Sequence, residues 1–426
     1  MGNVLDIAII GYGTAGQALA LLLSRDGHRV QVFERAAQPG PVGAGFLLQP
    51  TGLQVLWQMD LLPAALAHGA PVTRLYGETP CGRGVMDMRY AGLGAGLFGL
   101  GMQRGALFTL LDQAMGSGVE LHHGTRVVEV DHERGLLLDE HGRRHGPFDL
   151  VIAADGSASQ LRKQVGASGL DRVYPWGALW CLLPKGEWPW PDELRQRYVQ
   201  ARKMIGLLPV GTRPGDDVPK LSFFWSLPTT DFVAWQTGGL EAWREEVAGI
   251  WPQAGELLAG VQEASVLARA SYRDAVLPQW SRGRLVLAGD AAHAMSPQLG
   301  QGVNMALMDA MALRDALREE TDRDAALLRY QNQRKAHVAI YHFWSRWLTP
   351  LFQSERDVVA RVRDASFLPL GKLPGGNGHM LRILSGTQHG WFGKLALQPD
   401  FLKALSLQTQ AMKAIGSQRI NAGANP

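Results

Sequence analysis

The chain has 426 residues, enough for two or three domains with a sizeable core, and its 46% hydrophobic and 19% charged composition is that of an ordinary soluble globular protein. No run of about 18 apolar residues predicts a transmembrane segment, and the net charge of +3 comes from scattered basic residues, so we expect no nucleic-acid partner. Two distant cysteines and no apparent targeting signal indicate a cytoplasmic protein without a cysteine metal site.

The N-terminal segment combines a buried-strand pattern with a glycine-rich turn. Residues 4–10 form a short apolar run that leads into Gly11-x-Gly13-x-x-Gly16, and helical periodicity follows. A second predicted strand ends at Glu34, 18 residues beyond Gly16. In such a unit the glycines let the backbone approach a pyrophosphate at a helix N-terminus, and the acid accepts a ribose hydroxyl. The segment predicts a dinucleotide site, although the motif does not distinguish FAD from NAD.

The following hundred residues contain one candidate ligand side chain. Residues 41–52 are rich in glycine and proline and predict a loop, a helix is expected near 53–62, and residues 73–101 suggest short strands. A further amphipathic helix opens at Arg104. A cation at a helix start is unfavourable for the helix dipole, so we expect Arg104 to contact an anion, with a surface salt bridge as the alternative.

A third predicted strand ends in an Asp-Gly pair. Residues 119–148 alternate in short runs that suggest a small antiparallel meander, and they lead into an apolar strand at 150–154. Asp155 and Gly156 follow directly, with Arg162 a few residues later. Taken alone, an Asp-Gly pair predicts only a turn.

The stretch with the most candidate ligand-binding residues follows the apolar run 284–288, which predicts a buried strand. This strand delivers Gly289 and Asp290 to its carboxyl end, where the carboxylate could accept a hydrogen bond from a ligand hydroxyl. Gly300 and Gly302 precede an amphipathic helix, whose free N–H groups and positive dipole end suit a ligand that carries or develops negative charge. The alternative is a plain strand–loop–helix connection.

Aromatic residues concentrate in extended segments between residues 172 and 272, which predict a second, sheet-based domain. Along 221–227 the large residues alternate with Ser222, Phe224 and Ser226, so the strand has two different faces. We expect the aromatic face, with Phe223 and Trp225, to line a pocket for a flat apolar substrate, although plain core packing is the alternative.

The C-terminal part carries an aromatic stripe at helical spacing between residues 330 and 348. Such a stripe usually packs on its own protein; a membrane surface or a partner chain are the alternatives.

Together, the GxGxxG turn with Glu34, the Asp155-Gly156 pair with Arg162, and the stretch from Gly289 to Asn304 resemble the single-component FAD-dependent aromatic hydroxylases. These are the para-hydroxybenzoate hydroxylase-like flavoprotein monooxygenases, and the resemblance covers roughly residues 5–345. It implies an α/β fold with a Rossmann-like FAD-binding domain at 1–72, 101–171 and 275–340. It also implies an inserted β-sheet substrate domain at 73–100 and 172–274, and a C-terminal helical region at 341–426.

The resemblance also implies roles for individual residues. The pyrophosphate would lie on Gly11, Gly13, Thr14, Ala15 and Gly16, the adenosine ribose on Glu34, and the adenine side on Arg35 and Val128. Arg104 would reach the phosphate–ribityl region, Asp155 would serve both FAD and the nicotinamide, and Asp290 would bind a ribityl hydroxyl. Pro297 would lie near the flavin ring, with Gly300, Gly302, Val303 and Asn304 at its pyrimidine edge. His293 would be structural.

The implied chemistry belongs to the cofactor. NADH or NADPH would bind transiently and reduce FAD, and O₂ would then give a C4a-hydroperoxide that hydroxylates an aromatic or polycyclic small molecule. No catalytic side chain and no metal ligand is predicted. A ubiquinone-pathway hydroxylase, a halogenase or a prenyl-chain reductase on the same scaffold, an NAD-dependent dehydrogenase, and a non-catalytic flavin-binding protein remain alternatives.

Overall fold

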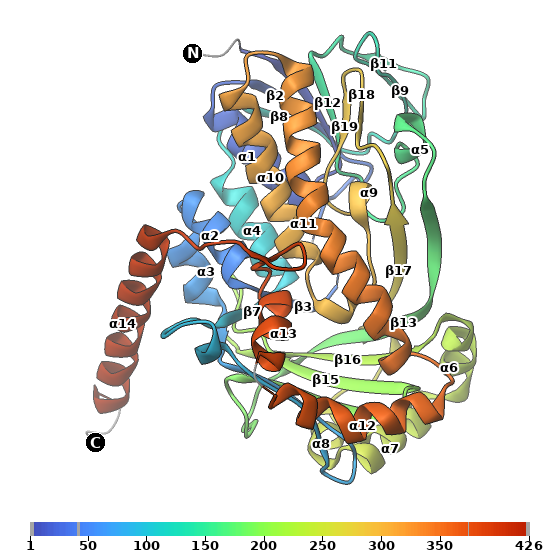
Figure 1. The fold of residues 1–426 in the computed structure, drawn as a ribbon, viewed down its shortest axis with the longest axis vertical. Helices are drawn as coiled ribbons and strands as arrows, with labels where there is room; N and C mark the ends of the chain where they lie inside the picture. Colours follow the sequence, from blue (N-terminus) through green and yellow to red (C-terminus); the bar gives the residue numbers. More distant parts are fainter. Residues whose placement is uncertain (1–3, 41–42, 374, 423–426) are drawn as a thin grey trace.

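The computed structural model describes residues 4–40, 43–373 and 375–422, with side chains up to residue 411. A six-stranded sheet in the order β18-β19-β12-β1-β2-β8, called the central sheet below, lies in the upper part of the molecule in Figure 1. Its strands are β1 (Asp6–Ile10), β2 (Arg29–Phe33), β8 (Val119–His122), β12 (Leu150–Ala153), β18 (Ser281–Arg282) and β19 (Leu285–Leu287). All pair in parallel except β18, which forms an antiparallel edge. The three apolar runs predicted as buried strands, β1, β12 and β19, are therefore neighbours, and their carboxyl ends meet at one sheet edge.

Helices pack on this sheet, whose inner strands β1, β12 and β19 are buried along nearly their whole length. Helix α1 (Thr14–Arg25) packs against α10 (Gly302–Glu319), which in turn packs against the 30-residue α11 (Arg323–Phe352). Helices α4 (Arg104–Ala114), α2 (Pro50–Gln58) and α3 (Leu62–His68) extend the same core. The mostly parallel sheet with helices packed on it is the Rossmann-like α/β arrangement that the sequence predicts.

Two local predictions were wrong. The segment predicted as a meander contributes β8 to the central sheet, and only β9 (Val127–Asp131), β10 (Leu136–Asp139) and β11 (Arg144–His145) form the antiparallel unit. The predicted loop at 41–52, of which 41–42 lie outside the described residues, contains β3 (Gly45–Leu48), paired with β7 (Gly99–Gln103); β4 (Ala70–Val72) completes that sheet. Short glycine-rich strands lack the apolar run that identifies longer ones.

A second, seven-stranded sheet has the order β17-β13-β16-β15-β14-β5-β6. Its strands are β5 (Arg74–Glu78), β6 (Gly84–Arg89), β13 (Leu170–Pro184), β14 (Glu193–Val199), β15 (Lys203–Pro209), β16 (Lys220–Pro228) and β17 (Ala268–Val276). Short helices α6 (Phe232–Gly238), α7 (Leu240–Ile250) and α8 (Pro252–Leu258) follow β16, and residues of α7 and α8 bury a separate apolar cluster with the sheet.

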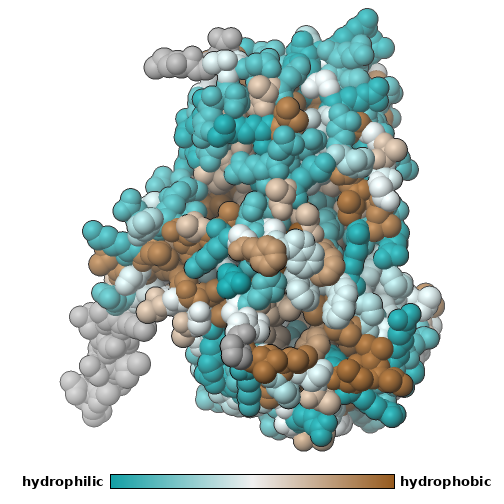
Figure 2. All heavy atoms as spheres, viewed as in Figure 1, coloured by the Kyte–Doolittle hydropathy of each residue, from teal (hydrophilic) through white to brown (hydrophobic). Residues whose placement is uncertain are grey.

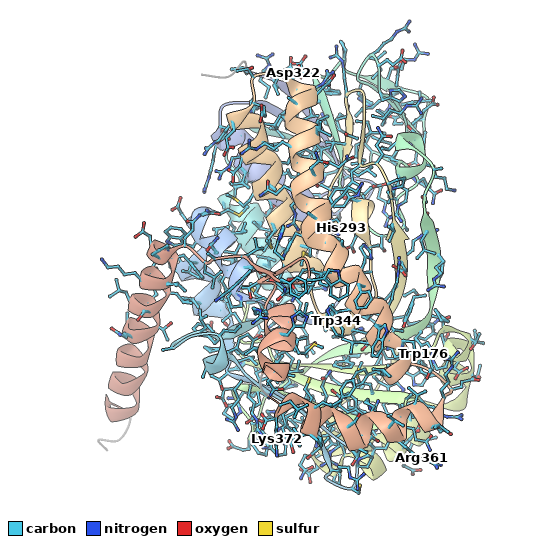
Figure 3. The ribbon with its side chains drawn as sticks, in the orientation of Figure 1. Trp176, His293, Asp322, Trp344, Arg361 and Lys372 are labelled. Carbon is cyan, nitrogen blue, oxygen red and sulfur yellow. The ribbon has the colours of Figure 1, made fainter. Side chains whose placement is uncertain are left out.

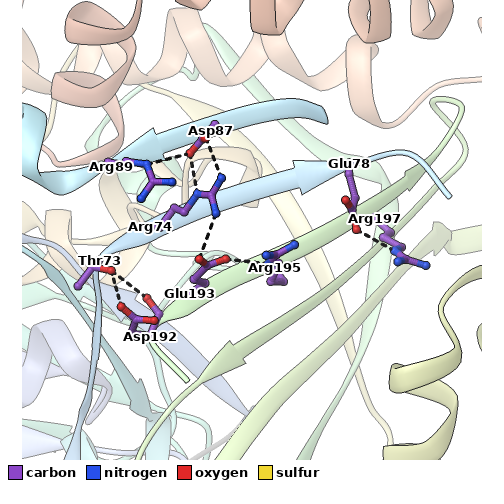
Figure 4. A network of polar contacts seen from close by, with 9 residues as sticks. All are labelled: Thr73, Arg74, Glu78, Asp87, Arg89, Asp192, Glu193, Arg195 and Arg197. Atoms are coloured by element: carbon purple, nitrogen blue, oxygen red, sulfur yellow. Dashed lines mark hydrogen bonds and ion pairs between the residues drawn. The ribbon is translucent and has the colours of Figure 1, made fainter. Parts of the chain in front are cut away.

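Ion pairs connect β5 and β6 with β14 (Figure 4). The pairing of β5 with β14 is parallel, whereas all other strand pairs of this sheet are antiparallel. Arg74 lies between Asp87, at 2.7 Å, and Glu193, at 3.2 Å, and Glu193 also accepts from Arg195 at 2.7 Å. Because these side chains are largely buried, the network ties the strands of residues 74–89 to the strand of residues 193–199, about a hundred residues later in the chain.

Two C-terminal helices, α12 (Asp357–Gly371) and α13 (Gly376–Leu384), contact β6 of the second sheet. They are followed by β20 (Gln388–His389), β21 (Gly393–Lys394) and α14 (Pro399–Ala422), which stands apart from that sheet on the side of α2 and α3 (Figure 1). Helix α11 runs without a break through the predicted domain limit at residue 340, and β17 runs through the limit at 274. No helix in the described part of the chain is long and apolar enough to cross a membrane.

Candidate active site

The glycine turn between β1 and α1 combines two tight backbone contacts with one open position. A Cβ atom on Gly11, whose φ is +104°, would lie 2.5 Å from the Ala154 carbonyl oxygen, and one on Gly16 would lie 2.0 Å from the Gly11 oxygen. At Gly13 a Cβ atom would meet nothing within 4 Å. The first N–H groups of α1, at Thr14 and Ala15, have no acceptor inside the helix. The turn therefore leaves a space lined by donors, which fits a phosphate group.

Glu34 lies beside this turn at the end of β2. Its carboxylate accepts the Tyr12 and Ala36 backbone N–H groups, each at 2.8 Å, which fix the side chain and leave further lone pairs on both oxygens. Arg35 is exposed and acts electrostatically on Asp155, and Val128 is exposed on β9. Arg35, which follows β2, and Asp155, which follows β12, are thus close enough to interact electrostatically.

Asp155 carries a buried carboxylate oxygen with no hydrogen-bond partner among the described residues. Burial raises the pKa of this carboxyl above its usual value, although Ser159, Arg162 and Arg35 act in the opposite direction. An unpaired buried oxygen is costly unless a ligand hydroxyl or N–H group satisfies it. The fully buried Arg162 donates to the carbonyl oxygens of Ser157, at 2.7 Å, and Asp290, at 3.0 Å, and so links the loops after β12 and β19.

The strand end at Gly289 is held by a buried polar network. Asp309 of α10 accepts the Gly289 N–H group at 2.8 Å, His293 Nε2 at 2.6 Å and Arg334 Nε at 2.6 Å. Burial alone would raise the pKa of Asp309, but the charges of His293 and Arg334 outweigh it and hold that pKa well below its usual range. His293 therefore has the structural role predicted for it. Asp290, which directly follows Gly289, is exposed and lines a large cavity.

The stretch after Asp290 lines the same cavity. Pro297, Gly300, Gly302 and Val303 all contribute to its wall, and α10 begins at Gly302. Asn304 differs, because its side chain is fully buried: Oδ1 accepts the Gln49 N–H group at 2.8 Å, and Nδ2 donates to the Leu47 carbonyl oxygen at 3.2 Å. The Asn304 side chain thus anchors the start of α10 to β3 and α2 and is not free for a ligand.

The cavity has a volume of about 820 Å³ and extends from the Asp290–Val303 loop to the second sheet. Arg104 lines one side of this cavity, where its side chain lies against Gly43 and its guanidinium carbon Cζ is 6.0 Å from the centre of the Phe46 ring. On the sheet side, Trp180 packs on Phe224 with ring centres 5.1 Å apart and donates from Nε1 to the Tyr272 hydroxyl at 3.1 Å. The remaining walls come from strands β5, β6, β14 and β15 and from helices α11, α12 and α13. They are mostly apolar and include Leu75, Met88, Leu194, Met204, Leu208, Trp344, Leu348, Phe352, Phe367, Met380 and Leu384. Figure 3 shows Trp344 on α11, close to where that helix passes α13.

The predicted substrate residues Phe223 and Trp225 lie on the wrong face of β16 for this cavity. Both are buried in the cluster under α7 and α8, where their rings meet Trp243 edge-on at 5.8 and 6.0 Å. Their neighbours Phe224 and Ser226 line the cavity. The alternation along β16 was correct, but the face with more aromatic residues is covered by helices, and the mixed face is open.

Several cavity residues were not identified individually from the sequence. Trp180 and Tyr272 lie in the aromatic-rich region 172–272, but no motif distinguishes them from its other aromatic residues, and Met380 lies on a short helix of the C-terminal region. The aromatic stripe at 330–348 contained Trp344 and Leu348, and it could have pointed to this wall.

Comparison with known proteins places this geometry among flavin enzymes. Residues 4–342 match the family described as "FAD binding domain". Kynurenine 3-monooxygenase of Salinispora arenicola is 30% identical over 379 residues, which cover 84% of this chain and 81% of that protein. The 2-heptyl-3-hydroxy-4(1H)-quinolone synthase of Pseudomonas aeruginosa is 30% identical over 353 residues, covering 78% and 86%. The crystal structure of Klebsiella pneumoniae HpxO complexed with FAD and uric acid aligns with a TM-score of 0.74 at 23% identity, over 89% of this chain and 97% of that one.

Proposed function

The chain belongs to the family of FAD-dependent aromatic hydroxylases, and we propose that it uses NADH or NADPH and O₂ to hydroxylate an apolar aromatic or polycyclic molecule. The observation that carries the proposal is the cavity itself, in which the Asp290–Val303 loop faces an aromatic sheet wall across a largely apolar space. Bound FAD would accept a hydride from the transient nicotinamide and, with O₂, supply one oxygen atom to the substrate ring.

The residues around the glycine turn and the loops fit this cofactor. The space at Gly13 and the N–H groups of Thr14 and Ala15 would take the pyrophosphate, and Glu34 would take the adenosine ribose. The unpaired oxygen of Asp155 and the exposed carboxylate of Asp290 would accept hydroxyl or amide hydrogens. The remaining predicted contacts are to Gly11, Gly16, Arg35, Arg104, Val128, Pro297, Gly300, Gly302 and Val303, with Asn304 acting through its backbone position.

The chain would support the reaction in two ways. The N–H groups of Gly302 and Val303 begin α10 beside the cavity, and such groups stabilise negative charge on a reduced ring. The apolar walls would exclude water, which limits the loss of activated oxygen as hydrogen peroxide.

The substrate class follows from the walls. Trp180, Phe224 and the methionines and leucines around them favour a flat, uncharged ring system. Arg104, Arg269 and Arg273 also line the cavity. However, Arg273 is paired with Asp171 and Arg269 is hydrogen-bonded to Gln236, so these two are already partnered and favour a substrate carboxylate less. Tyr272 offers a hydroxyl that could orient a substrate oxygen.

We would test the proposal by incubating the FAD-loaded protein in air with NADH or NADPH and a panel of bicyclic aromatics and small benzoates. The readouts are nicotinamide consumption, hydrogen peroxide and product mass. We expect a bicyclic compound to accelerate consumption and to gain one oxygen atom. A preference for benzoates would contradict the substrate class, and a protein that binds no FAD would contradict the function.

A further inference from the structure

One face of the molecule concentrates exposed apolar side chains. Both tryptophans and both phenylalanines that are exposed in the described part of the chain lie within residues 343–392. We define the C-terminal apolar face by eight exposed residues of α11, α12, the turn after α12 and the β20–β21 turn: Phe343, Trp347, Val358, Val362, Leu370, Leu373, Trp391 and Phe392. Figure 2 shows apolar patches along α12 on this side of the molecule. Exposed patches of this kind mark interaction surfaces.

The aromatic residues of this face form one cluster. Phe343 packs against Trp391 with ring centres 4.7 Å apart and against Trp344 at 5.5 Å, and Trp344 neighbours Trp347 at 6.4 Å. Phe392 beside them is 100% exposed. Along α12, Val358, Val362 and Leu370 recur at helical spacing, so one side of the helix presents apolar residues to solvent.

The same segment carries a net positive charge. Residues 343–394 contain seven lysines and arginines and three acidic residues, a net charge of +4, while the whole chain has +3. Arg356, Arg361, Lys372 and Lys394 are exposed, and Figure 3 shows Arg361 and Lys372 toward the two ends of α12. Exposed tryptophans together with lysines and arginines are typical of surfaces that bind anionic lipid headgroups.

This face also borders the mouth of the cavity. Trp347 and Leu370 are 60% and 54% exposed, and both line the cavity, together with Trp344 of α11 and Met380 of α13. The exposed apolar surface is therefore continuous with the apolar interior.

We propose that the C-terminal apolar face docks on an anionic lipid surface, so that an apolar substrate dissolved in the lipid enters the cavity between α11 and α12. The docking stands on surface residues alone; only the substrate's route rests on the proposed function. A second copy of the chain fits this face less well, because a two-fold contact would bring two segments of charge +4 together. Lysine is also depleted in interfaces between proteins.

The test is sedimentation of the full-length, FAD-loaded protein with vesicles of phosphatidylcholine alone or with added phosphatidylglycerol. We expect binding to the anionic vesicles that weakens at high salt, because headgroup attraction is screened. Trp391→Ser combined with Phe392→Ser should lower the partition coefficient tenfold or more, about what the loss of two buried aromatic rings implies. Arg361→Glu combined with Lys372→Glu should lower it by about fivefold per residue or more.

The matched control is Val218→Ser combined with Val233→Ser, which removes two exposed apolar residues away from the face and should leave vesicle binding unchanged. None of the substituted residues lines the cavity, so flavin content should stay at the wild-type level in every variant and report correct folding.

The proposal is overturned if the wild-type protein stays in the supernatant with anionic vesicles, or if the two face variants bind as well as wild type. A dimer in solution that only the face variants dissociate, without vesicle binding, would assign the face to a second copy instead. Vesicle binding without any oxygenase activity would leave the docking standing and would contradict only the proposed function.

Discussion

Gly13 and Gly16 lie three residues apart in one turn, yet their side-chain positions meet different surroundings. We predict that Gly13→Val abolishes FAD binding, because the new side chain would fill the open space before α1, while the free energy of unfolding of the apoprotein changes by less than about 1 kcal/mol. Gly16→Val should instead destabilise the apoprotein by about 3 kcal/mol or more, because its Cβ atom would overlap the Gly11 oxygen. Flavin-to-protein ratios and urea unfolding distinguish the two effects. Retention of FAD by Gly13→Val would remove the turn from the cofactor site.

Asp290 is the second residue whose role a single substitution can isolate. Its carboxylate is exposed beside the cavity, so Asp290→Ala should weaken FAD binding at least tenfold and alter the stability of the apoprotein by about 0.5 kcal/mol or less. The matched control is Asp217→Ala, which removes an exposed carboxylate from the loop between β15 and β16 and should bind FAD as wild type does. Equal FAD affinity in both variants would show that Asp290 does not contact the cofactor.

At the scale of elements, the two faces of β16 have different roles: Phe223 packs in the buried core, and its neighbour Phe224 lines the cavity. Phe223→Ala should cost about 3–5 kcal/mol of stability, because the ring is fully buried against Trp243. Phe224→Ala should enlarge the cavity and change KM and product profile more than kcat for the native substrate. Steady-state kinetics and thermal unfolding of the two variants provide the measurement. If Phe223→Ala changed selectivity while Phe224→Ala did not, the face assignment would be reversed.

The Asp309 carboxylate of α10 holds together the segment after β19 and helix α11, because it accepts hydrogen bonds from both. Asp309→Asn should lower the stability at pH 7 by about 3–5 kcal/mol, because it leaves the buried His293 and Arg334 without their negative partner. The depressed pKa of Asp309 means that its contribution is complete above about pH 4 and is lost as the pH falls further. The difference in stability between wild type and variant should therefore shrink below pH 4. A constant difference down to pH 2 would contradict the ion-pair role, and the exposed Asp217→Asn is the control.

For the molecule as a whole, FAD should act as a folding ligand, because its predicted site joins three separate chain segments at one sheet edge. Free FAD at 100 times its Kd should raise the free energy of unfolding by about 2.7 kcal/mol if only the native state binds it. Chemical unfolding with and without FAD measures this shift, and the Gly13→Val variant should show none. A shift of equal size in that variant would mean that FAD binds elsewhere.

The sequence by itself determined the strand–turn–helix at the N-terminus, the three buried strands that became β1, β12 and β19, and the start of α10. It did so because these features depend on local physics: glycines permit backbone contacts that other residues prohibit, and apolar runs of strand length must be buried. Because β2, β12 and β19 all run parallel to β1 in one sheet, Glu34, Asp155 and Asp290, which follow these strands, lie along the same sheet edge.

Only the tertiary structure decided which face of β16 lines the cavity, that the Asn304 side chain serves packing, and that β8 joins the central sheet. An alternating strand has two faces, and its pattern does not say which of them a distant helix will cover. Here α7 and α8 cover the face of Phe223, while α11, α12 and α13, more than a hundred residues later, close the cavity over the face of Phe224. Those contacts join residues far apart in the chain, and no local pattern encodes them.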